Sequence, residues 1–118
     1  MLRIIRLPFL ALSFASLSYP TASQEARRVI EVHAHRYAFE PSSIAVHRGE
    51  TIELRLVSDD VPHSLLIEAL GIDEEASKSH PGDVVFKATR TGDFEGRCGR
   101  FCGSGHGRMR FTVHVTGD

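Results

Sequence analysis

Apolar and polar residues alternate with a period near two from Arg28 to the end of the chain. The stretch 51–56 is the clearest case, because Ile52, Leu54 and Leu56 would share one face of a strand and polar residues the other. The alternation predicts strands at 29–39, 43–47, 51–58, 63–68, 83–89, 93–98 and 109–115. Residues 70–80 do not alternate, and we expect a loop or a helical turn there.

Turn-forming pairs separate these runs: Glu40-Pro41, Arg48-Gly49, Val61-Pro62, Pro81-Gly82 and Thr91-Gly92. Short strands with one apolar face each, at this regular spacing, are typical of an all-β protein. The pattern therefore predicts a two-sheet antiparallel sandwich. The sequence contains no internal repeat and no low-complexity tract.

The first residues have the three-part layout of a secretory signal. Arg3 and Arg6 form a basic start, residues 7–19 are mostly apolar or small, and residues 21–23 are small enough for cleavage. The alternative is a retained membrane anchor, but the apolar run is shorter than the ~20 residues that a spanning helix needs. We expect a signal peptide at 1–23 and one exported domain at 24–118, in the periplasm or an equivalent compartment.

Charge narrows the choice of partner. The chain has 14 Lys and Arg against 15 Asp and Glu, so removing Arg3 and Arg6 leaves 12 against 15, a net charge of −3. A weakly acidic chain without a basic run argues against nucleic acid. Four arginines nevertheless cluster in one region, at positions 97, 100, 108 and 110. They form either a solvated rim or a docking surface for an acidic partner.

The stretch CGRFCGSGHGRM (98–109) holds both cysteines, and it falls in a glycine-rich loop between two predicted strands. A disulfide here would close a very small ring and stabilise little. Zinc suits Cys98, Cys102 and His106, but the thioether of Met109 is a poor zinc ligand. Thiol–disulfide catalysis normally uses a closer cysteine pair. Copper accepts thiolate, thioether and imidazole together, so the residue types favour copper.

A copper site on this loop needs a further ligand, and His63 is the candidate. It lies between the turn at Val61-Pro62 and an apolar run, where an unpaired ring would be costly. A strand beginning at the same end of the sandwich would bring its imidazole beside the cysteines. The remaining histidines are expected at the surface: His33, His35, His47, His80 and His114.

The spacing Cys-x-x-x-Cys-x-x-x-His-x-x-Met, with an upstream His before an apolar strand, resembles the dinuclear copper A domain. That cupredoxin domain occurs in subunit II of cytochrome c oxidase and in nitrous oxide reductase. The resemblance spans RYAFEPSSIAVHRGETIELRLVSDDVPHSLLI and GDFEGRCGRFCGSGHGRMRFTVHV. It implies a Greek-key β-sandwich of about seven to eight strands.

The resemblance also implies a ligand set for two copper ions. Cys98 and Cys102 would bridge the ions, and His63 and His106 would each cap one. Met109 would be a weak sulfur ligand, and Arg100 would offer its backbone carbonyl.

The function implied is an exported electron carrier rather than an enzyme. It would pass single electrons in a respiratory-type chain to or from redox partners such as a cytochrome or an oxidase. Membrane contact would come only through a partner or an uncleaved signal. Three alternatives stay open: a mononuclear blue-copper carrier using His63, Cys102, His106 and Met109, a copper chaperone or buffer for an exported oxidase, and a sensor or assembly domain that docks on a larger oxidase. The chain has no Trp, and Gly96 stands where relatives often carry an aromatic residue, which predicts looser packing there.

Overall fold

The computed structural model describes residues 11, 13–21 and 26–117. Of the predicted signal segment 1–23, residues 1–10, 12, 22 and 23 therefore lie outside the described residues. Within 26–117 the chain forms nine strands and two short 3-10 helices. In chain order these are β1 (Arg27–His35), β2 (Ala38–Glu40), β3 (Ser43–His47), β4 (Thr51–Ser58), β5 (His63–Ile67), η1 (Glu68–Leu70), β6 (Ile72–Ala76), β7 (Gly82–Lys87), β8 (Gly92–Arg97), η2 (His106–Arg108) and β9 (Arg110–Thr116).

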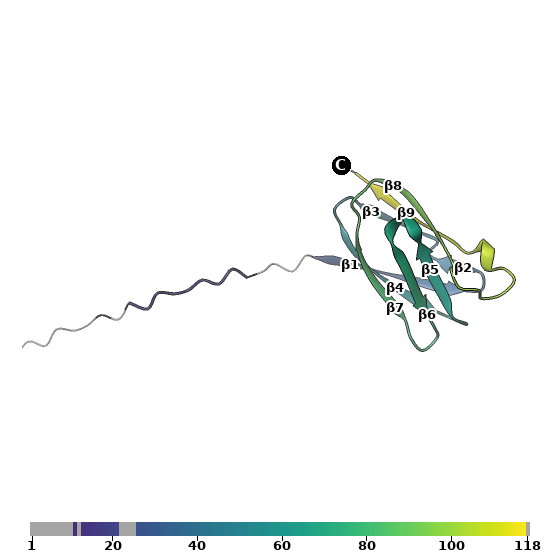
Figure 1. Cartoon of the computed structure of the whole chain (residues 1–118), viewed down its shortest axis with the longest axis horizontal. Helices are drawn as coiled ribbons and strands as arrows, with labels where there is room; N and C mark the ends of the chain where they lie inside the picture. Colours follow the sequence, from purple (N-terminus) through teal and green to yellow (C-terminus); the bar gives the residue numbers. More distant parts are fainter. Residues whose placement is uncertain (1–10, 12, 22–25, 118) are drawn as a thin grey trace, which may run out of the picture.

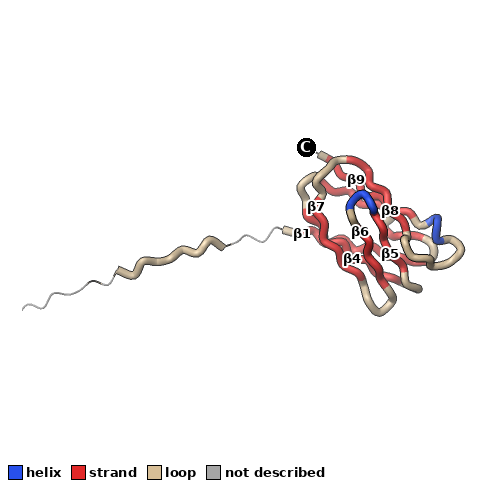
Figure 2. The backbone as a smooth tube through the Cα atoms, viewed as in Figure 1, coloured by secondary structure: helices blue, strands red, loops and turns tan. Residues whose placement is uncertain are grey.

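The strands form two facing sheets, so the predicted all-β sandwich is confirmed (Figures 1 and 2). One sheet has the order β2-β1-β4-β7 and the other the order β3-β9-β8-β5-β6. The expectation of antiparallel pairing throughout was wrong, because β1 pairs with β4 and β3 with β9 in parallel. The chain leaves the first sheet after β2, adds β3 to the second and returns as β4, so β4 enters beside β1 in the same direction.

Two strand assignments also differ from the prediction. The run 29–39 is not one strand, since the chain turns at Arg36 and Tyr37 and β2 folds back antiparallel on β1. Residues 70–80 contain a strand, β6, which pairs antiparallel with β5. Its alternation is weak because only Ile72 and Ala76 face the core and the three residues between them are acidic.

Alternating side chains from both sheets fill the space between the layers. The buried members include Val32, Ile52, Leu54 and Leu56 from the first sheet and Leu65, Ile67, Phe111 and Val113 from the second. Burying each such Leu or Ile contributes roughly 1.5–3 kcal/mol of hydrophobic stabilisation. Phe39 and Phe111 meet edge to face with ring centroids 6.0 Å apart, which joins β2 of one sheet to β9 of the other.

Gly96 is closely packed, so the expectation of looser packing beneath the loop was wrong. A Cβ at this position would lie 2.6 Å from Ile67 Cγ1 and 3.0 Å from the Leu66 carbonyl oxygen. Ile67 and the backbone of Leu66, both in the neighbouring strand β5, occupy the volume that a larger side chain would need. No helix among the described residues is long and apolar enough to cross a membrane.

Candidate metal centre

Two segments that are distant in sequence meet at one end of the sandwich. His63 begins β5, directly after the turn that follows β4, and the loop 98–109 joins β8 to β9. Figure 1 shows this loop, with its short helix η2 in yellow-green, at the end of the molecule away from the C-terminus. The arrangement predicted for His63 and the cysteine loop is therefore the one that the fold adopts.

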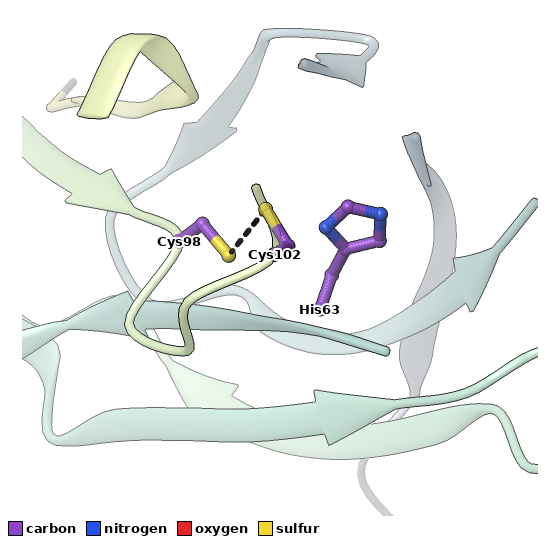
Figure 3. A group of neighbouring side chains, drawn as sticks. All are labelled: His63, Cys98 and Cys102. Carbon is purple, nitrogen blue, oxygen red and sulfur yellow. Dashed lines mark hydrogen bonds between the residues drawn. The ribbon is translucent and has the colours of Figure 1, made fainter. Parts of the chain in front are cut away.

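Sulfur and imidazole donors converge there. The Sγ atoms of Cys98 and Cys102 are 3.8 Å apart and both thiols are free. Ligand atoms of His63, Cys98 and Cys102 all lie within 4.8 Å of one another, and all three residues are buried (Figure 3). Cys102 Sγ lies 3.5 Å from Met109 Sδ and 3.9 Å from His106 Nδ1.

The backbone carbonyl of Arg100 faces this group. Its oxygen lies 3.0 Å from Cys98 Sγ, while the guanidinium points outward and forms an ion pair with Glu75. The structure thus separates the two parts of this residue. The carbonyl adjoins the sulfur cluster, and the side chain belongs to the surface.

His63 carries an unusual unsatisfied atom. Its side chain is fully buried, and its Nδ1 has no hydrogen-bond partner within the described residues. Its other nitrogen, Nε2, lies 2.6 Å from Asp60 Oδ1, so Nε2–H donates to the carboxylate and Nδ1 keeps a free lone pair. An unpaired buried nitrogen is costly, and a ring held by a carboxylate behind it is the usual arrangement of a metal-binding histidine.

Asp60 is held as an anion at this position. Burial alone would raise its pKa, but hydrogen bonds from the Arg36 backbone N–H, from His63 and from the Val61 backbone N–H outweigh burial and lower the pKa to about 2. The carboxylate is therefore ionised at neutral pH. It fixes both the ring orientation and the tautomer of His63.

The two thiols adjoin in an apolar environment. Burial, reinforced by neighbouring Cys98, raises the pKa of Cys102 to about 11. In the absence of a metal the Cys102 thiol stays protonated at neutral pH, and a metal must displace its proton to bind. A thiol that ionises this poorly is a weak nucleophile, so the cysteine pair suits binding of a thiophilic metal ion better than thiol catalysis.

Neighbouring segments that were not predicted as part of the site position the loop. Arg36 Nε donates to the Cys102 carbonyl at 3.0 Å, and the Gly99 N–H donates to Ser64 Oγ at 3.0 Å. Tyr37 lies so close that a Cβ at Gly103 would be 2.3 Å from its hydroxyl oxygen. The glycine-rich sequence was the available signal, since closely spaced glycines indicate that another group approaches the backbone.

Asp60 was also missed, although it lies only three residues before His63. A carboxylate at that spacing, directly before a turn, is a usable signal for a residue that orients a histidine. The predicted surface positions of the other histidines are confirmed, because none of the five is buried.

Residues 8–109 match the cupredoxin-like domain family. Because this match covers most of the 118 residues, the chain belongs to that family.

Its relatives include subunit 2 of cytochrome c oxidase. The protein from Cereibacter sphaeroides is 30% identical over 77 residues, which is 65% of this chain and 25% of the relative. The protein from Thermus thermophilus is 29% identical over 86 residues, 73% of this chain and 64% of the relative. The chain therefore spans less than two thirds of the length of these curated relatives.

Solved structures show the same fold. The periplasmic domain of cytochrome oxidase subunit II from Bradyrhizobium japonicum superposes with a TM-score of 0.70 at 20% identity, covering 76% of this chain and 84% of that one. A mixed disulfide intermediate between a thioredoxin-like protein and subunit II of cytochrome c oxidase gives 0.64 at 21% identity, covering 86% and 88%. Auracyanin A, a blue copper protein from Chloroflexus aurantiacus, gives 0.62 at 14% identity, covering 77% and 100%. The predicted cupredoxin-like sandwich and the resemblance to oxidase subunit II are confirmed.

Proposed function

We propose that this chain is an exported copper-binding electron-transfer protein with a dinuclear copper A site, which passes single electrons in a respiratory-type chain. The observation that carries the proposal is the unpaired, buried Nδ1 of His63 beside two free thiols. The adjacent thioether of Met109 favours copper over zinc. Similarity to oxidase subunit II supports the same ion.

The candidate ligands would have different roles in binding two copper ions. Cys98 and Cys102, as thiolates, would bridge them and offset much of their charge. His63 through Nδ1 and His106 would each cap one ion, and Met109 and the Arg100 carbonyl would complete the shell. Copper, when bound, supplies a one-electron couple.

The frame around these ligands is suited to electron transfer. His63 is fixed by Asp60, the Cys102 carbonyl by Arg36 and the Gly99 amide by Ser64, so little has to rearrange when the charge of the centre changes. Protein groups fill the proposed ligand positions, whereas a catalytic metal keeps one open. We therefore infer a carrier and not an enzyme.

Partners and location follow from the same argument. Redox proteins, a cytochrome or an oxidase, would exchange the electron, and the exported domain would meet a membrane only through a partner or an uncleaved signal at 1–23. Because copper requires both thiols reduced, a thioredoxin-like reductant is a second class of redox partner. The mixed disulfide known for an oxidase subunit II supports that class.

The test is the copper content and the EPR spectrum of the purified, copper-loaded protein. We expect about two coppers per chain and a hyperfine pattern from one electron shared over both. Cys98→Ser should abolish that pattern. If Cys98→Ser leaves the spectrum intact with one copper per chain, the site is the mononuclear blue-copper alternative. Rapid transfer of Cu(I) to an acceptor, without reversible one-electron redox, would instead establish a chaperone.

A further inference from the structure

A single phenyl side chain projects from the loop 98–109, which carries most of the proposed copper ligands and is called the metal loop below. Phe101 is 78% exposed although the next residue, Cys102, is buried. Its ring centroid lies 5.8 Å from that of His106, and the two ring planes are tilted by 47°. Isolated exposed apolar residues are common, but the Phe101 ring adjoins one proposed ligand, His106, and Phe101 directly precedes another, Cys102.

Phe101 also forms one wall of an open hollow of ≈250 Å³ beside Cys102. Val61 and Pro62 supply further apolar wall, and the side chains of Arg36 and Arg100 flank it. The hollow therefore combines an apolar floor with a cationic edge. That combination, an apolar centre with aromatic and arginine residues and a polar rim, is the usual anatomy of a protein interface.

The arginines near the loop 98–109 differ in whether they form ion pairs. Arg36 and Arg108 are exposed, and neither forms an ion pair within the described residues. Arg36 Nε donates a hydrogen bond to the Cys102 carbonyl. The guanidinium of Arg108 lies over the Tyr37 ring, with Cζ 5.8 Å from the ring centroid. Arg100 is the exception, since it pairs with Glu75.

None of the nearby carboxylates forms an ion pair with Arg36 or Arg108 within the described residues. Asp60 accepts hydrogen bonds from His63 and from backbone amides, and Asp59 accepts one from His33. The face beside His63, Cys98 and Cys102 therefore presents the guanidinium groups of Arg36 and Arg108 without a carboxylate paired to either among the described residues, although residues 24–118 carry a net charge of −3.

We propose that Phe101, the hollow beside it and the surrounding Arg36, Arg100 and Arg108 form the docking surface for an electron-transfer protein with an acidic contact face. Phe101 seats in the partner, and the arginines steer and orient it. One electron then passes between the centre and the partner's redox group across the Phe101 and His106 contact. The inference rests on the proposed electron-carrier function and adds the charge of the partner and its point of contact.

The experiment uses one haem protein in two charge forms. The copper-loaded, reduced protein is mixed in a stopped-flow instrument with a basic ferric cytochrome c, or with the same cytochrome after succinylation of its lysines. In each reaction one electron leaves the copper centre and reduces Fe(III) haem to Fe(II), with no proton transferred. At low ionic strength we expect the succinylated form to react at least about tenfold faster, and the difference to shrink as salt is added.

Two variants and a matched control localise the effect. Arg108→Glu should slow the reaction with succinylated cytochrome by about threefold or more at low salt and speed the reaction with the basic form. Phe101→Ala should slow both reactions at high salt as well, because it removes contact rather than charge. Arg48→Glu, an exposed charge reversal at the turn between β3 and β4 at the opposite end, should change neither rate by more than about twofold.

The outcomes separate this inference from the proposed function. Copper content and EPR spectra matching those of the unaltered chain show that each variant keeps its centre. A loaded protein that reacts faster with the basic cytochrome, or an Arg48→Glu effect as large as that of Arg108→Glu, overturns the docking surface and leaves the carrier function standing. Self-association through Phe101, detected by sedimentation and abolished in Phe101→Ala, also overturns it. A chain that binds no copper, or whose copper does not cycle, refutes the proposed function itself.

Discussion

Tyr37 packs against the backbone of the metal loop, and this contact makes a sharp prediction about Gly105. A Cβ built at Gly105 would lie 2.4 Å from Tyr37 Cδ2 and 2.5 Å from Cγ. Carbon atoms prefer a separation of about 3.5–4.0 Å, so the ring or the loop must shift by roughly 1 Å to admit an alanine. The backbone is not the obstacle, because the φ angle of Gly105 is −92°, which any residue adopts.

The expected cost of Gly105→Ala follows from two opposing effects. Forcing a methyl group into a packed site costs about 1–3 kcal/mol, and the lower entropy of the unfolded alanine chain returns about 0.4–1 kcal/mol. The mid-values of these ranges give a net loss of about 1.3 kcal/mol in the free energy of unfolding, which in a domain of this size lowers Tm by roughly 5–10 °C. Since the next residue is His106, the shift should also weaken copper binding.

Gly107→Ala is the matched control. It changes the same residue type two positions along the loop, where nothing lies within 4 Å of the built Cβ. Urea denaturation of the metal-free proteins measures the stability of each variant, and copper competition with a chelator measures affinity. The reasoning is refuted if Gly105→Ala is as stable as the unaltered chain, or if Gly107→Ala loses as much. Trimming Tyr37 to Leu in the Gly105→Ala background should recover part of the copper affinity.

Three further predictions concern the ligands and the surface. Asp60→Asn keeps an oxygen for the His63 ring but removes the charge, so copper affinity measured by chelator competition should fall about 10–100-fold, and unchanged affinity would contradict the orienting role. Met109→Leu conserves volume at a buried position, so it should cost less than about 1.5 kcal/mol while shifting the reduction potential measured by voltammetry; an unmoved potential would exclude the thioether from the shell. Hydrogen bonds to Asp59 and Glu31 raise the pKa of His33 above its ordinary 6.5, so its contribution to stability is present below that pH and is lost as pH rises through the raised value. The stability difference between the unaltered metal-free chain and His33→Gln should therefore shrink as pH rises from below 6.5 through the raised pKa, and a difference that grew with pH would refute the assignment.

The strand pattern could be read from the sequence where one face is strongly apolar. Ile52, Leu54 and Leu56 alternate without interruption, and β4 lies where they predict it. β6 was not recognised because acidic residues separate its two inward positions. Parallel pairing of β1 with β4 could not be read at all, since alternation specifies the faces of a strand but not its neighbours or its direction.

The donor set of the candidate site was predictable because most of it is local. Cys98, Cys102, His106 and Met109 occupy one short loop, so their spacing alone brings them near one another, and the cost of burying an unpaired imidazole pointed to His63. The tertiary structure decided which nitrogen of His63 is free, because that depends on how the turn holding Asp60 meets the start of β5. It also decided that Arg36 and Tyr37, more than sixty residues earlier in the chain, support the loop and contribute to its charged face. Contacts of that kind arise from the packing of the two sheets as a whole, which no local pattern of residues encodes.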